Sequence, residues 1–466
     1  MKLGKVLRSL ALVGLVSVFV FPGPSQAKAG LGEGADKALT RELDQLIGDT
    51  GTKVPGLGVI VFKDGREVYS HFAGHRYFAQ KAGEKDLPVI RDTRFRAASV
   101  SKLFTGFTIL QLVDQGKLSL DEDVSKPLGF TLRNPAYPDR PITVRMLLSH
   151  TSSLRDGELY AIPPDISVRE FFVPDGRYWE EGAHFAPEGQ APGEYFKYAN
   201  INYGLLGTII EKVTGQRFDL YQKSHILKEL DIRADYKVGG LTPEGFRNLG
   251  TIYQKNQEGH WEETLPWIAQ IDDYRGKQPP AEEIRVENPD HRSLDAFYDL
   301  KDYKPGTNAT IFSPQGGLRI SYEELSHALA LLVNKGRYKD RQVVRKDLLQ
   351  EMMKPQWVYD AQKENGDTYD GAIETYGLGL YRILGNSTSR VCKDHEIDLV
   401  GHTGEAYGLL SGLFVVPGTR DGFLYMMNGE AVEEDEDPRS AGAYSGNYRW
   451  EELIMNAICE HGFIEK

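Results

Sequence analysis

A serine and a lysine stand three residues apart in the stretch Arg94-Phe95-Arg96-Ala97-Ala98-Ser99-Val100-Ser101-Lys102, just before an apolar run. Positions i and i+3 share one face of a helix, so Ser99 Oγ and the Lys102 amine are expected to be neighbours if a helix begins here. A lysine desolvated by apolar neighbours has a lowered pKa and can accept a proton from a serine hydroxyl. The unpaired N–H groups at a helix start would stabilise an oxyanion above Ser99. The pattern therefore indicates nucleophilic catalysis, while the simpler alternative is a serine that caps a helix and a solvated lysine.

Two later segments could complete such a site. Tyr198 and Asn200 flank Ala199 ahead of an apolar helix, where a phenol could handle a proton and an amide could hold a substrate peptide group. Gly401-His402-Thr403-Gly404 lies between strand signals, where glycine allows backbone to approach a ligand closely. Each segment also has an ordinary interpretation, in which the tyrosine packs, the asparagine caps a helix and the histidine is structural.

In this order, the three motifs resemble those of the serine β-lactamase-like and penicillin-binding-protein-like hydrolases. The motifs are Ser-X-X-Lys at a helix start, Tyr-X-Asn in a helical region and His-Thr-Gly on a late strand. They are most similar to the branch that joins class C β-lactamases, D,D-carboxypeptidases, D-aminopeptidases and some esterases. The segment 143–154 and Gly316-Gly317-Leu318 also resemble this family. The resemblance extends over roughly residues 35–460 and is weakest at 241–310.

The resemblance implies three catalytic residues. Ser99 would be the acylated nucleophile, Lys102 its proton acceptor, and Tyr198 the residue that relays protons to the leaving group and during deacylation. Both lysine and tyrosine have been proposed as the acylation base in such enzymes, so the choice between Lys102 and Tyr198 stays open. The backbone N–H groups of Ser99 and Glu405 would form the oxyanion hole.

The substrate-binding residues that the resemblance implies are Asn200, His402, Thr403, Gly404 and Glu405. Class C β-lactamases typically carry lysine at the position of His402, and His-Thr-Gly is more like D,D-peptidases and related amidases. Without a permanent cation there, a carboxylate-bearing β-lactam is a weaker candidate substrate. Glu405 is acidic where the family usually has a small residue, which suggests a substrate amine nearby.

The elements that must position these residues come from both ends of the chain. Asp64-Gly65 between apolar runs predicts a hairpin of strands 57–62 and 67–72. Apolar periodicity predicts helices over 35–47, 103–116, 201–213, 322–334, 346–353 and 450–459, and strands over 376–384, 397–401, 408–416 and 422–427. This order predicts an α/β (α+β) fold of the β-lactamase/transpeptidase type, with an antiparallel sheet flanked by helices and an inserted, mostly helical domain.

The predicted division of the chain has four parts. They are a signal peptide at 1–27, a sheet domain at 30–98 plus 311–466, a mostly helical domain at 99–240, and a polar, loop-rich insertion at 241–310. Basic residues, an apolar run over 10–21 and small residues at 25–27 define the signal peptide, which predicts a periplasmic or secreted protein. No later segment is long and apolar enough to predict a membrane span, so no stable anchor is expected after cleavage.

The composition of the chain limits the kinds of molecule that it is expected to bind. A net charge of −12 argues against nucleic acid or an anionic membrane and leaves a small-molecule or peptide substrate. The histidines and cysteines show no metal-ligand spacing, and no phosphate- or dinucleotide-binding motif is present, so no metal and no cofactor are predicted. The oligomeric state is unknown. The cysteines, Cys392 and Cys459, could be a disulfide or two buried thiols. We predict a disulfide, because the final helix should pack on the late strands.

The sequence therefore predicts an exported serine hydrolase that acts through an acyl-enzyme on Ser99. The most plausible reaction is amide or peptide cleavage of the D,D-peptidase or D-aminopeptidase kind. A carboxylesterase or a class C-like β-lactamase on the same machinery is the alternative. A rival of another class is a penicillin-binding receptor that is acylated without turnover.

Overall fold

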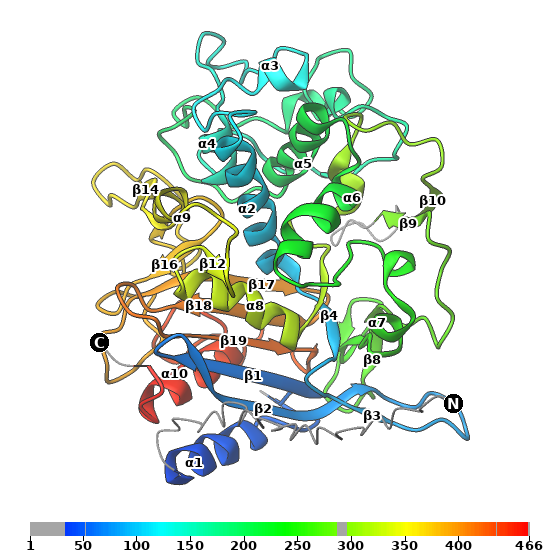
Figure 1. Cartoon of the computed structure of the whole chain (residues 1–466), viewed down its shortest axis with the longest axis vertical. Coiled ribbons are helices and arrows are strands. Elements are labelled where there is room, and N and C mark those ends of the chain that lie inside the picture. The colour runs from blue at the N-terminus through cyan, green and yellow to red at the C-terminus, as the bar shows by residue number, and fades with distance from the viewer. Residues whose placement is uncertain (1–32, 52, 287–295, 435, 465–466) are drawn as a thin grey trace, which may run out of the picture.

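A nine-stranded antiparallel sheet forms the centre of the computed structural model, which describes residues 33–51, 53–286, 296–434 and 436–464 (Figure 1). In spatial order the strands are β14 (Trp357–Val358), β15 (Thr375–Tyr376), β16 (Tyr381–Ile383), β17 (Leu399–Ala406), β18 (Leu409–Val415), β19 (Gly422–Met427), β1 (Gly56–Lys63), β2 (Arg66–Tyr77) and β3 (Leu87–Pro88). β1 pairs with β19, with Leu57 opposite Met427, so strands from the two ends of the chain meet in the middle of the sheet. The α/β fold with a large antiparallel sheet is as predicted.

Alternating side chains divide the sheet into two apolar faces. Val59 and Val61 of β1 join a core with helices α1 (Glu33–Asp44) and α10 (Arg449–Glu460), whereas Ile60 belongs to the core on the opposite face. This is the period of two that a strand imposes on its side chains. The sheet is therefore covered by helices on both faces, as Figure 1 shows.

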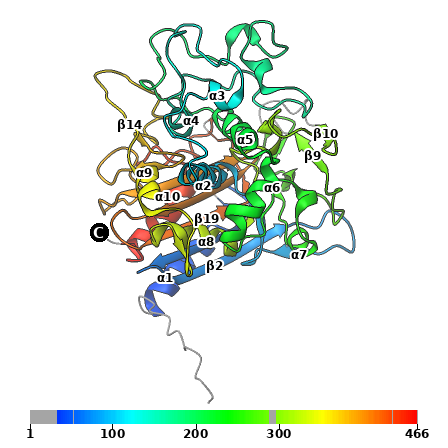
Figure 2. The ribbon, with the colours of Figure 1, turned by 45° about the horizontal axis from the view of Figure 1, so that its top comes forward.

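Helix α8 (Tyr322–Val333) lies against β1, β18 and β19 on the second face. It begins with a capping box, in which the Ser321 side chain accepts from the Glu324 N–H and the Glu324 carboxylate accepts from the Ser321 N–H. Beside it, α2 (Ser101–Asp114) runs from the sheet into the helical region and is seen end-on in Figure 2. The other helices on this side are α3 (Ser125–Leu128), α4 (Val144–Leu148), α5 (Ile201–Thr214), α6 (Phe218–Gln222) and α9 (Lys346–Met353).

The segment 241–310 contains several short helical and strand elements. They are α7 (Pro243–Arg247), β5 (Ile252–Gln254), β6 (Asn256–Gln257), β7 (His260–Trp261), β8 (Ile268–Ile271), β9 (Glu283–Val286) and β10 (Ala296–Asp299). β5 lies between β8 and β20 (Gly429–Glu430) and runs parallel to β20. The segment is thereby attached to the chain that follows β19.

Two strand predictions need correction. The predicted strand 376–384 is two short strands, β15 and β16, because the chain turns between them at Gly379, whose φ of 82° favours glycine. The predicted strand 397–401 continues to Ala406 as β17, so His-Thr-Gly-Glu lies within a strand. Glycine is uncommon within strands, but Gly404 lies against backbone where a side chain would not fit.

The predicted disulfide between Cys392 and Cys459 is confirmed, with the two Cα atoms 5.8 Å apart. It ties the chain before β17 to the end of α10. Both cysteines are buried in the core on the α1 and α10 side of the sheet.

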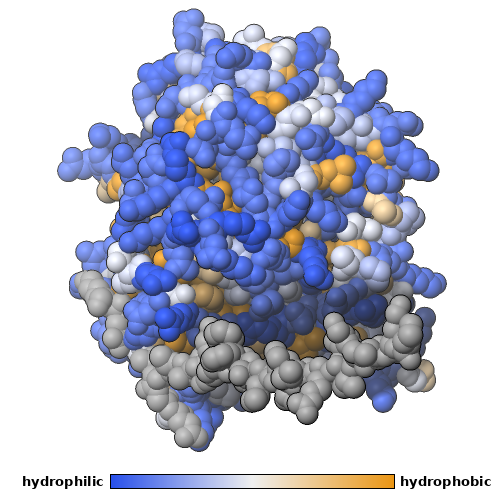
Figure 3. Space-filling view, viewed as in Figure 1, coloured by the Kyte–Doolittle hydropathy of each residue, from blue (hydrophilic) through white to orange (hydrophobic). Residues whose placement is uncertain are grey.

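The face drawn in Figure 3 is mainly hydrophilic, and its hydrophobic residues form small separate groups. Among the described residues, every helix is too short or too polar to span a bilayer. The predicted signal peptide, residues 1–27, lies outside the described residues.

Candidate active site

Ser99 lies in a short 3₁₀ turn, η1 (Ala98–Val100), that leads directly into α2. Neither this turn nor α2 has a side-chain cap, so Ser99 is not the capping residue of the simpler interpretation. Ala98, the residue before it, has a φ of 44°, in the left-handed region that residues with a side chain rarely adopt. Strain of this kind is common where a fold presents a reactive group.

The Ser99 hydroxyl meets two other side chains of the sequence prediction. Lys102 Nζ donates to Ser99 Oγ at 2.9 Å, and Tyr198 Oη donates to the same atom at 2.9 Å. The lysine comes from the first turn of α2, and the tyrosine from the loop before α5. Residues almost a hundred positions apart in sequence therefore converge on one oxygen.

Lys102 is fully buried, and its amine is held in a fixed direction. Besides Ser99 it contacts Asn200 Oδ1 at 3.0 Å and the Gln315 carbonyl at 3.2 Å. These two oxygens only accept, so they take two N–H groups of Lys102 and leave the third position of the nitrogen toward Ser99. Burial holds the pKa of Lys102 well below its usual value, which makes the neutral amine accessible. Its lone pair would then point at the serine hydroxyl.

Tyr198 is enclosed by other rings and by the lysine. His150 stacks on its ring with centroids 4.2 Å apart, and Lys102 Nζ lies 4.6 Å from the ring centroid. Burial raises the pKa of Tyr198 well above its usual value, so the phenol keeps its proton at neutral pH. In this geometry Tyr198 can give a proton, and Lys102 can receive one.

Asn200 does not cap α5, because its side chain has other partners. Its Oδ1 accepts from Lys102, and its Nδ2 donates to Asp156 Oδ2 at 3.3 Å. Asp156 Oδ1 also accepts from the backbone N–H of Ile201 at 2.8 Å. The carboxylate thus occupies the end of α5 where N–H groups are unpaired, and it fixes the orientation of the Asn200 amide.

Strand β17 passes directly behind the nucleophile. A Cβ placed on Gly404 would lie 2.9 Å from the backbone nitrogen of Ser99 and 2.7 Å from the carbonyl oxygen of Ala97. The next strand reinforces this contact, because Ser411 Oγ donates to the Ala97 carbonyl at 3.0 Å. Only glycine fits at position 404, and the contact brings the neighbouring Glu405 beside the Ser99 turn.

His402 and Thr403 are held by tyrosines of β15 and β16. The His402 Nδ1–H donates to the Thr403 carbonyl, so its Nε2 accepts from the Tyr376 hydroxyl at 2.9 Å. Burial and the nearby Lys102 lower the pKa of His402 to about 3, so its imidazole is neutral. The Thr403 hydroxyl is 2.9 Å from that of Tyr381.

A cleft of about 780 Å³ opens above Ser99. It brings together every residue of the predicted site except Lys102, which lies beneath its floor. Its lining includes Ser99, Tyr198, Asn200, His402, Thr403, Gly404, Glu405, Gln254, Tyr407, Tyr448 and Glu451. Gln254 belongs to β5, so the segment 241–310 contributes to the wall of the cleft.

One end of this cleft is acidic. Glu405 is exposed and accepts a hydrogen bond from the Tyr448 hydroxyl at 3.2 Å. Glu451 is buried and accepts from the Tyr425 hydroxyl at 2.6 Å, and burial raises its pKa to about 8. Burial and the acidic neighbours Glu405 and Glu430 raise the pKa of Glu434.

Sequence reasoning assigned no individual role to Asp156, His150 or the Gln315 carbonyl. His150 falls within the segment 143–154 that carries the family resemblance. Asp156 follows it in an irregular loop without periodicity, and a backbone carbonyl leaves no signal in a sequence. Tyr376 and Tyr381 hold the β17 side chains, but the sequence predicted only that they lie in a strand.

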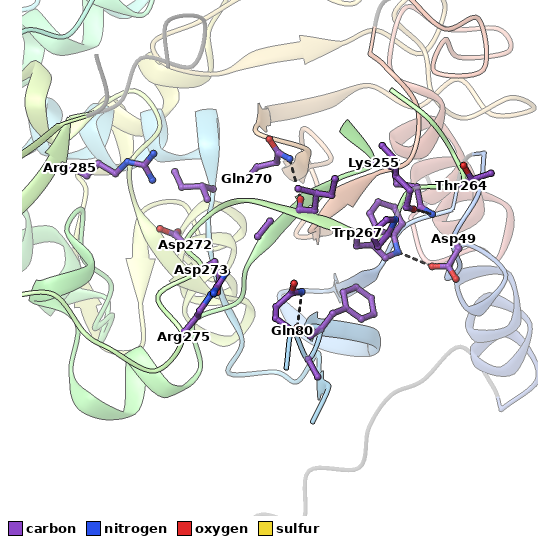
Figure 4. Close-up of a pocket in the computed structure, with 17 residues that line it drawn as sticks. Asp49, Gln80, Lys255, Thr264, Trp267, Gln270, Asp272, Asp273, Arg275 and Arg285 are labelled. Carbon is purple, nitrogen blue, oxygen red and sulfur yellow. Dashed lines mark hydrogen bonds and ion pairs between the residues drawn. The ribbon is translucent and has the colours of Figure 1, made fainter. Parts of the chain in front are cut away.

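A second hollow lies away from Ser99, where the loop after α1, the chain after β2 and the 241–310 segment meet (Figure 4). Its volume is about 920 Å³. Trp267 Nε1 donates to Asp49 at 2.9 Å, and Lys255 lies over the Trp267 ring while donating to the Glu263 and Leu265 carbonyls. The polar groups of Trp267 and Lys255 are therefore already hydrogen-bonded within the protein. In the described parts of the chain, no group of three histidine, cysteine or acidic side chains could hold a metal ion.

Comparisons with known proteins agree with this fold. The sequence model of the family described as Beta-lactamase matches residues 43–445. Protein flp of Staphylococcus aureus (strain MW2) is 31% identical over 183 residues, which are 39% of this chain and 34% of that protein. An N-acetylmuramyl-L-alanine amidase of Bacillus subtilis (strain 168) is 25% identical over 64% of each chain. The chain thus matches about a third of the length of the first of these relatives.

The fold agrees with that of the D-amino acid amidase from Ochrobactrum anthropi SV3. The TM-score is 0.57 at 20% identity, and the match covers 92% of this chain and 99% of the amidase. The chain belongs to the β-lactamase family. It has the fold of the β-lactamase-like and penicillin-binding-protein-like proteins.

Proposed function

We propose that this enzyme cleaves an amide bond through an acyl-enzyme on Ser99. The observation that carries the proposal is the convergence of Lys102 Nζ and Tyr198 Oη on Ser99 Oγ, each at 2.9 Å. A buried, neutral amine beside a serine can accept the hydroxyl proton and so activates the serine oxygen as a nucleophile. A protonated phenol at the same oxygen supplies the proton that an amine leaving group needs.

The proposed reaction balances its protons within these groups. Ser99 Oγ attacks the amide carbon while its proton passes to Lys102, and the carbonyl oxygen becomes an oxyanion beside the backbone N–H groups of Ser99 and Glu405. The C–N bond then breaks, and the leaving amine takes the Tyr198 proton. The proton held by Lys102 restores Tyr198. Water finally attacks the ester, gives one proton to the serine oxygen and releases the acid.

The surroundings of the cleft support a substrate with a free amine. His402 is neutral, so the site has no permanent cation at the position where it would meet a substrate carboxylate. Glu405 is exposed beside the Ser99 turn, and Tyr448 holds its carboxylate. A carboxylate at this place would attract an ammonium group. The D-amino acid amidase of similar fold acts, by its name, on amides of this type, which supports the same class here.

A matched substrate panel tests the proposal. It contains a D-amino acid amide, its N-acetylated form, a D-alanyl-D-alanine peptide, a short p-nitrophenyl ester and a chromogenic cephalosporin. We expect turnover of the free-amine amide with kcat/KM at least about tenfold above that of the N-acetylated form, since one charged contact is worth roughly 1 to 3 kcal/mol. Glu405→Gln should reduce this preference while sparing the ester rate.

Each other result of the substrate panel would contradict a different part of the proposal. Ester cleavage without amide cleavage would make the protein a carboxylesterase. Efficient cephalosporin turnover would make it a β-lactamase. Stoichiometric acylation by a penicillin without release would make it a receptor. Equal rates for the free and acetylated amides would remove the amine from the substrate class and leave amide cleavage in place.

We also propose that the enzyme acts outside the cytoplasm. The signal-like residues 1–27 and the buried Cys392–Cys459 disulfide both support an oxidising compartment. Mass spectrometry of the protein recovered from an exporting host should find a chain that begins after Ala27. An intact N-terminus on protein retained in the cytoplasm would contradict export.

A further inference from the structure

His150 is a buried histidine that does not line the cleft, yet its ring lies directly against that of Tyr198. Its imidazole stacks on the Tyr198 ring, with centroids 4.2 Å apart and the planes at 27°. Its backbone φ is 57°, so the chain turns in a left-handed conformation to place the ring there.

Hydrogen bonds add to this stacking. His150 Nδ1 accepts from the backbone N–H of Ala199 at 3.1 Å and from Asn202 Nδ2 at 3.1 Å. The His150 carbonyl accepts from the backbone N–H of Lys197 at 3.1 Å. The residues before and after Tyr198 therefore both donate backbone hydrogen bonds to His150, and these bonds restrict the position of the phenol.

The same contacts fix the charge of the imidazole. A nitrogen that accepts two N–H groups carries no hydrogen of its own, so the His150 hydrogen is on Nε2 and the ring is neutral. Nε2 is buried and has no hydrogen-bond partner among the described residues. Burial and the nearby Lys102 hold the pKa of His150 well below its usual value. A neutral ring beneath the phenol leaves Tyr198 protonated, whereas a cation would favour its phenolate.

We propose that His150 is a positioning residue for Tyr198, which it holds as a protonated phenol against Ser99 Oγ. This inference rests on the proposed amide cleavage, in which Tyr198 protonates the leaving amine. It makes His150 important for amides and much less so for p-nitrophenyl esters, whose leaving group departs without a proton.

Two substitutions separate the contacts of His150. His150→Asn keeps an acceptor for the N–H groups and tolerates a positive φ, but it removes the ring. His150→Phe keeps the ring and removes the acceptor. We expect both to lower kcat for the amide by about 10- to 100-fold with KM within about twofold. The p-nitrophenyl ester kcat should stay within about threefold.

A double-mutant cycle with Tyr198→Phe tests whether His150 acts through the phenol. Combining His150→Asn with Tyr198→Phe should cost no more amide activity than Tyr198→Phe alone, because the two changes remove one function. His327→Asn is the matched control, since His327 is a partly buried histidine on α8 that donates to the Leu230 carbonyl away from the cleft. It should change amide and ester rates equally or not at all.

The outcomes decide the proposal separately from the amide hydrolase function. Amide turnover by the unmodified enzyme is measured first, and its absence would reject the proposed function before any variant is made. With turnover present, equal losses for amide and ester would show that His150 serves only stability. Losses that multiply in the double variant would also overturn the proposal. If His150→Asn does not fold, by circular dichroism, the same ratios are read from His150→Phe.

Discussion

The carboxylate of Asp156 accepts a hydrogen bond from Asn200 Nδ2 at 3.3 Å and so decides which way the Asn200 amide faces. With the nitrogen turned to Asp156, the amide oxygen is directed to Lys102 Nζ at 3.0 Å. The same carboxylate raises the pKa of Lys102, against the larger lowering by burial. Asp156 is therefore linked to Lys102, the proposed serine base, both through the Asn200 amide and through its charge.

Asp156→Asn should move the pH dependence of the reaction. In the proposed mechanism the neutral amine of Lys102 is the proton acceptor, so kcat/KM should rise with pH through the Lys102 pKa of the free enzyme. Removing the carboxylate removes a group that favours the ammonium, so this pKa falls and the acid limb moves to lower pH, by about 0.5 to 1 unit. Profiles of kcat/KM against pH for both proteins measure the shift. An unmoved or upward-moved limb would separate Asp156 from the base.

Ser99→Ala should abolish turnover and covalent labelling together, whereas Ser101→Ala should keep labelling. Ser101 is buried, and its Oγ accepts from the Leu318 N–H at 3.2 Å, so it cannot reach a substrate. Its loss should cost only about 1 kcal/mol of stability. Intact-mass spectrometry with a fluorophosphonate or a penicillin that labels the unmodified protein measures both variants. A stoichiometric adduct on Ser99→Ala would overturn the assignment.

Lys102→Ala should lower the acylation rate by about 10² to 10⁴, the usual contribution of a general base. Lys102→Arg should not restore it, because a guanidinium stays protonated. Pre-steady-state acylation by an activated ester measures both. A Lys102→Arg variant with nearly unmodified rates would show that a positive charge, rather than a proton acceptor, is needed at this position.

Glu451→Gln should stabilise the protein, and increasingly so as pH rises from about 5 to 8. Burial raises the folded-state pKa of Glu451 to about 8. Between its usual pKa and this value the unfolded chain loses the proton that the folded chain keeps, so the stability of the folded state falls as pH rises. Glutamine keeps an oxygen for the Tyr425 hydroxyl and does not titrate. We expect equal Tm values near pH 4 and a difference of roughly 2 to 6 °C at pH 8 by thermal unfolding.

Replacing both Cys392 and Cys459 by serine should lower the free energy of unfolding by roughly 2 to 4 kcal/mol. The disulfide joins residues separated by 67 positions, so the unfolded chain is strongly restricted by it. Denaturant unfolding of the oxidised protein and of the double variant measures the loss. Thiol titration of the denatured, unreduced protein should find no free thiol, and two free thiols would contradict the bond.

The parts of this structure that depend on local contacts could be predicted from the sequence. Asp64-Gly65 defines the first hairpin, and apolar spacing defines α2 and α5 to within a few residues. The Ser99 and Lys102 pair could be predicted because it depends only on helical spacing within one turn. A motif whose residues contact one another within one turn of helix can therefore be recognised before the fold is known.

The remaining parts of the site depend on contacts across the fold. Asp156 reaches Asn200 only because an irregular loop passes the start of α5. The predicted strand ends at Gly401 and is too short, because glycine is disfavoured within strands, whereas the reason for Gly404 is the Ser99 backbone behind it. Neither a loop path nor a close approach of distant backbone has a periodic signal in the sequence.

The pairing of β1 with β19 also determines when the enzyme can become active. β1 is synthesised long before β19, and β17, the strand beside Ser99, is synthesised long after the Ser99 turn. Contacts between such distant segments are slow to form. The nascent chain therefore holds its nucleophile segment without the strand that completes the cleft until β17 has been made. Catalytic activity should appear only after β17, β18 and β19 have been made and have paired into the sheet with β1.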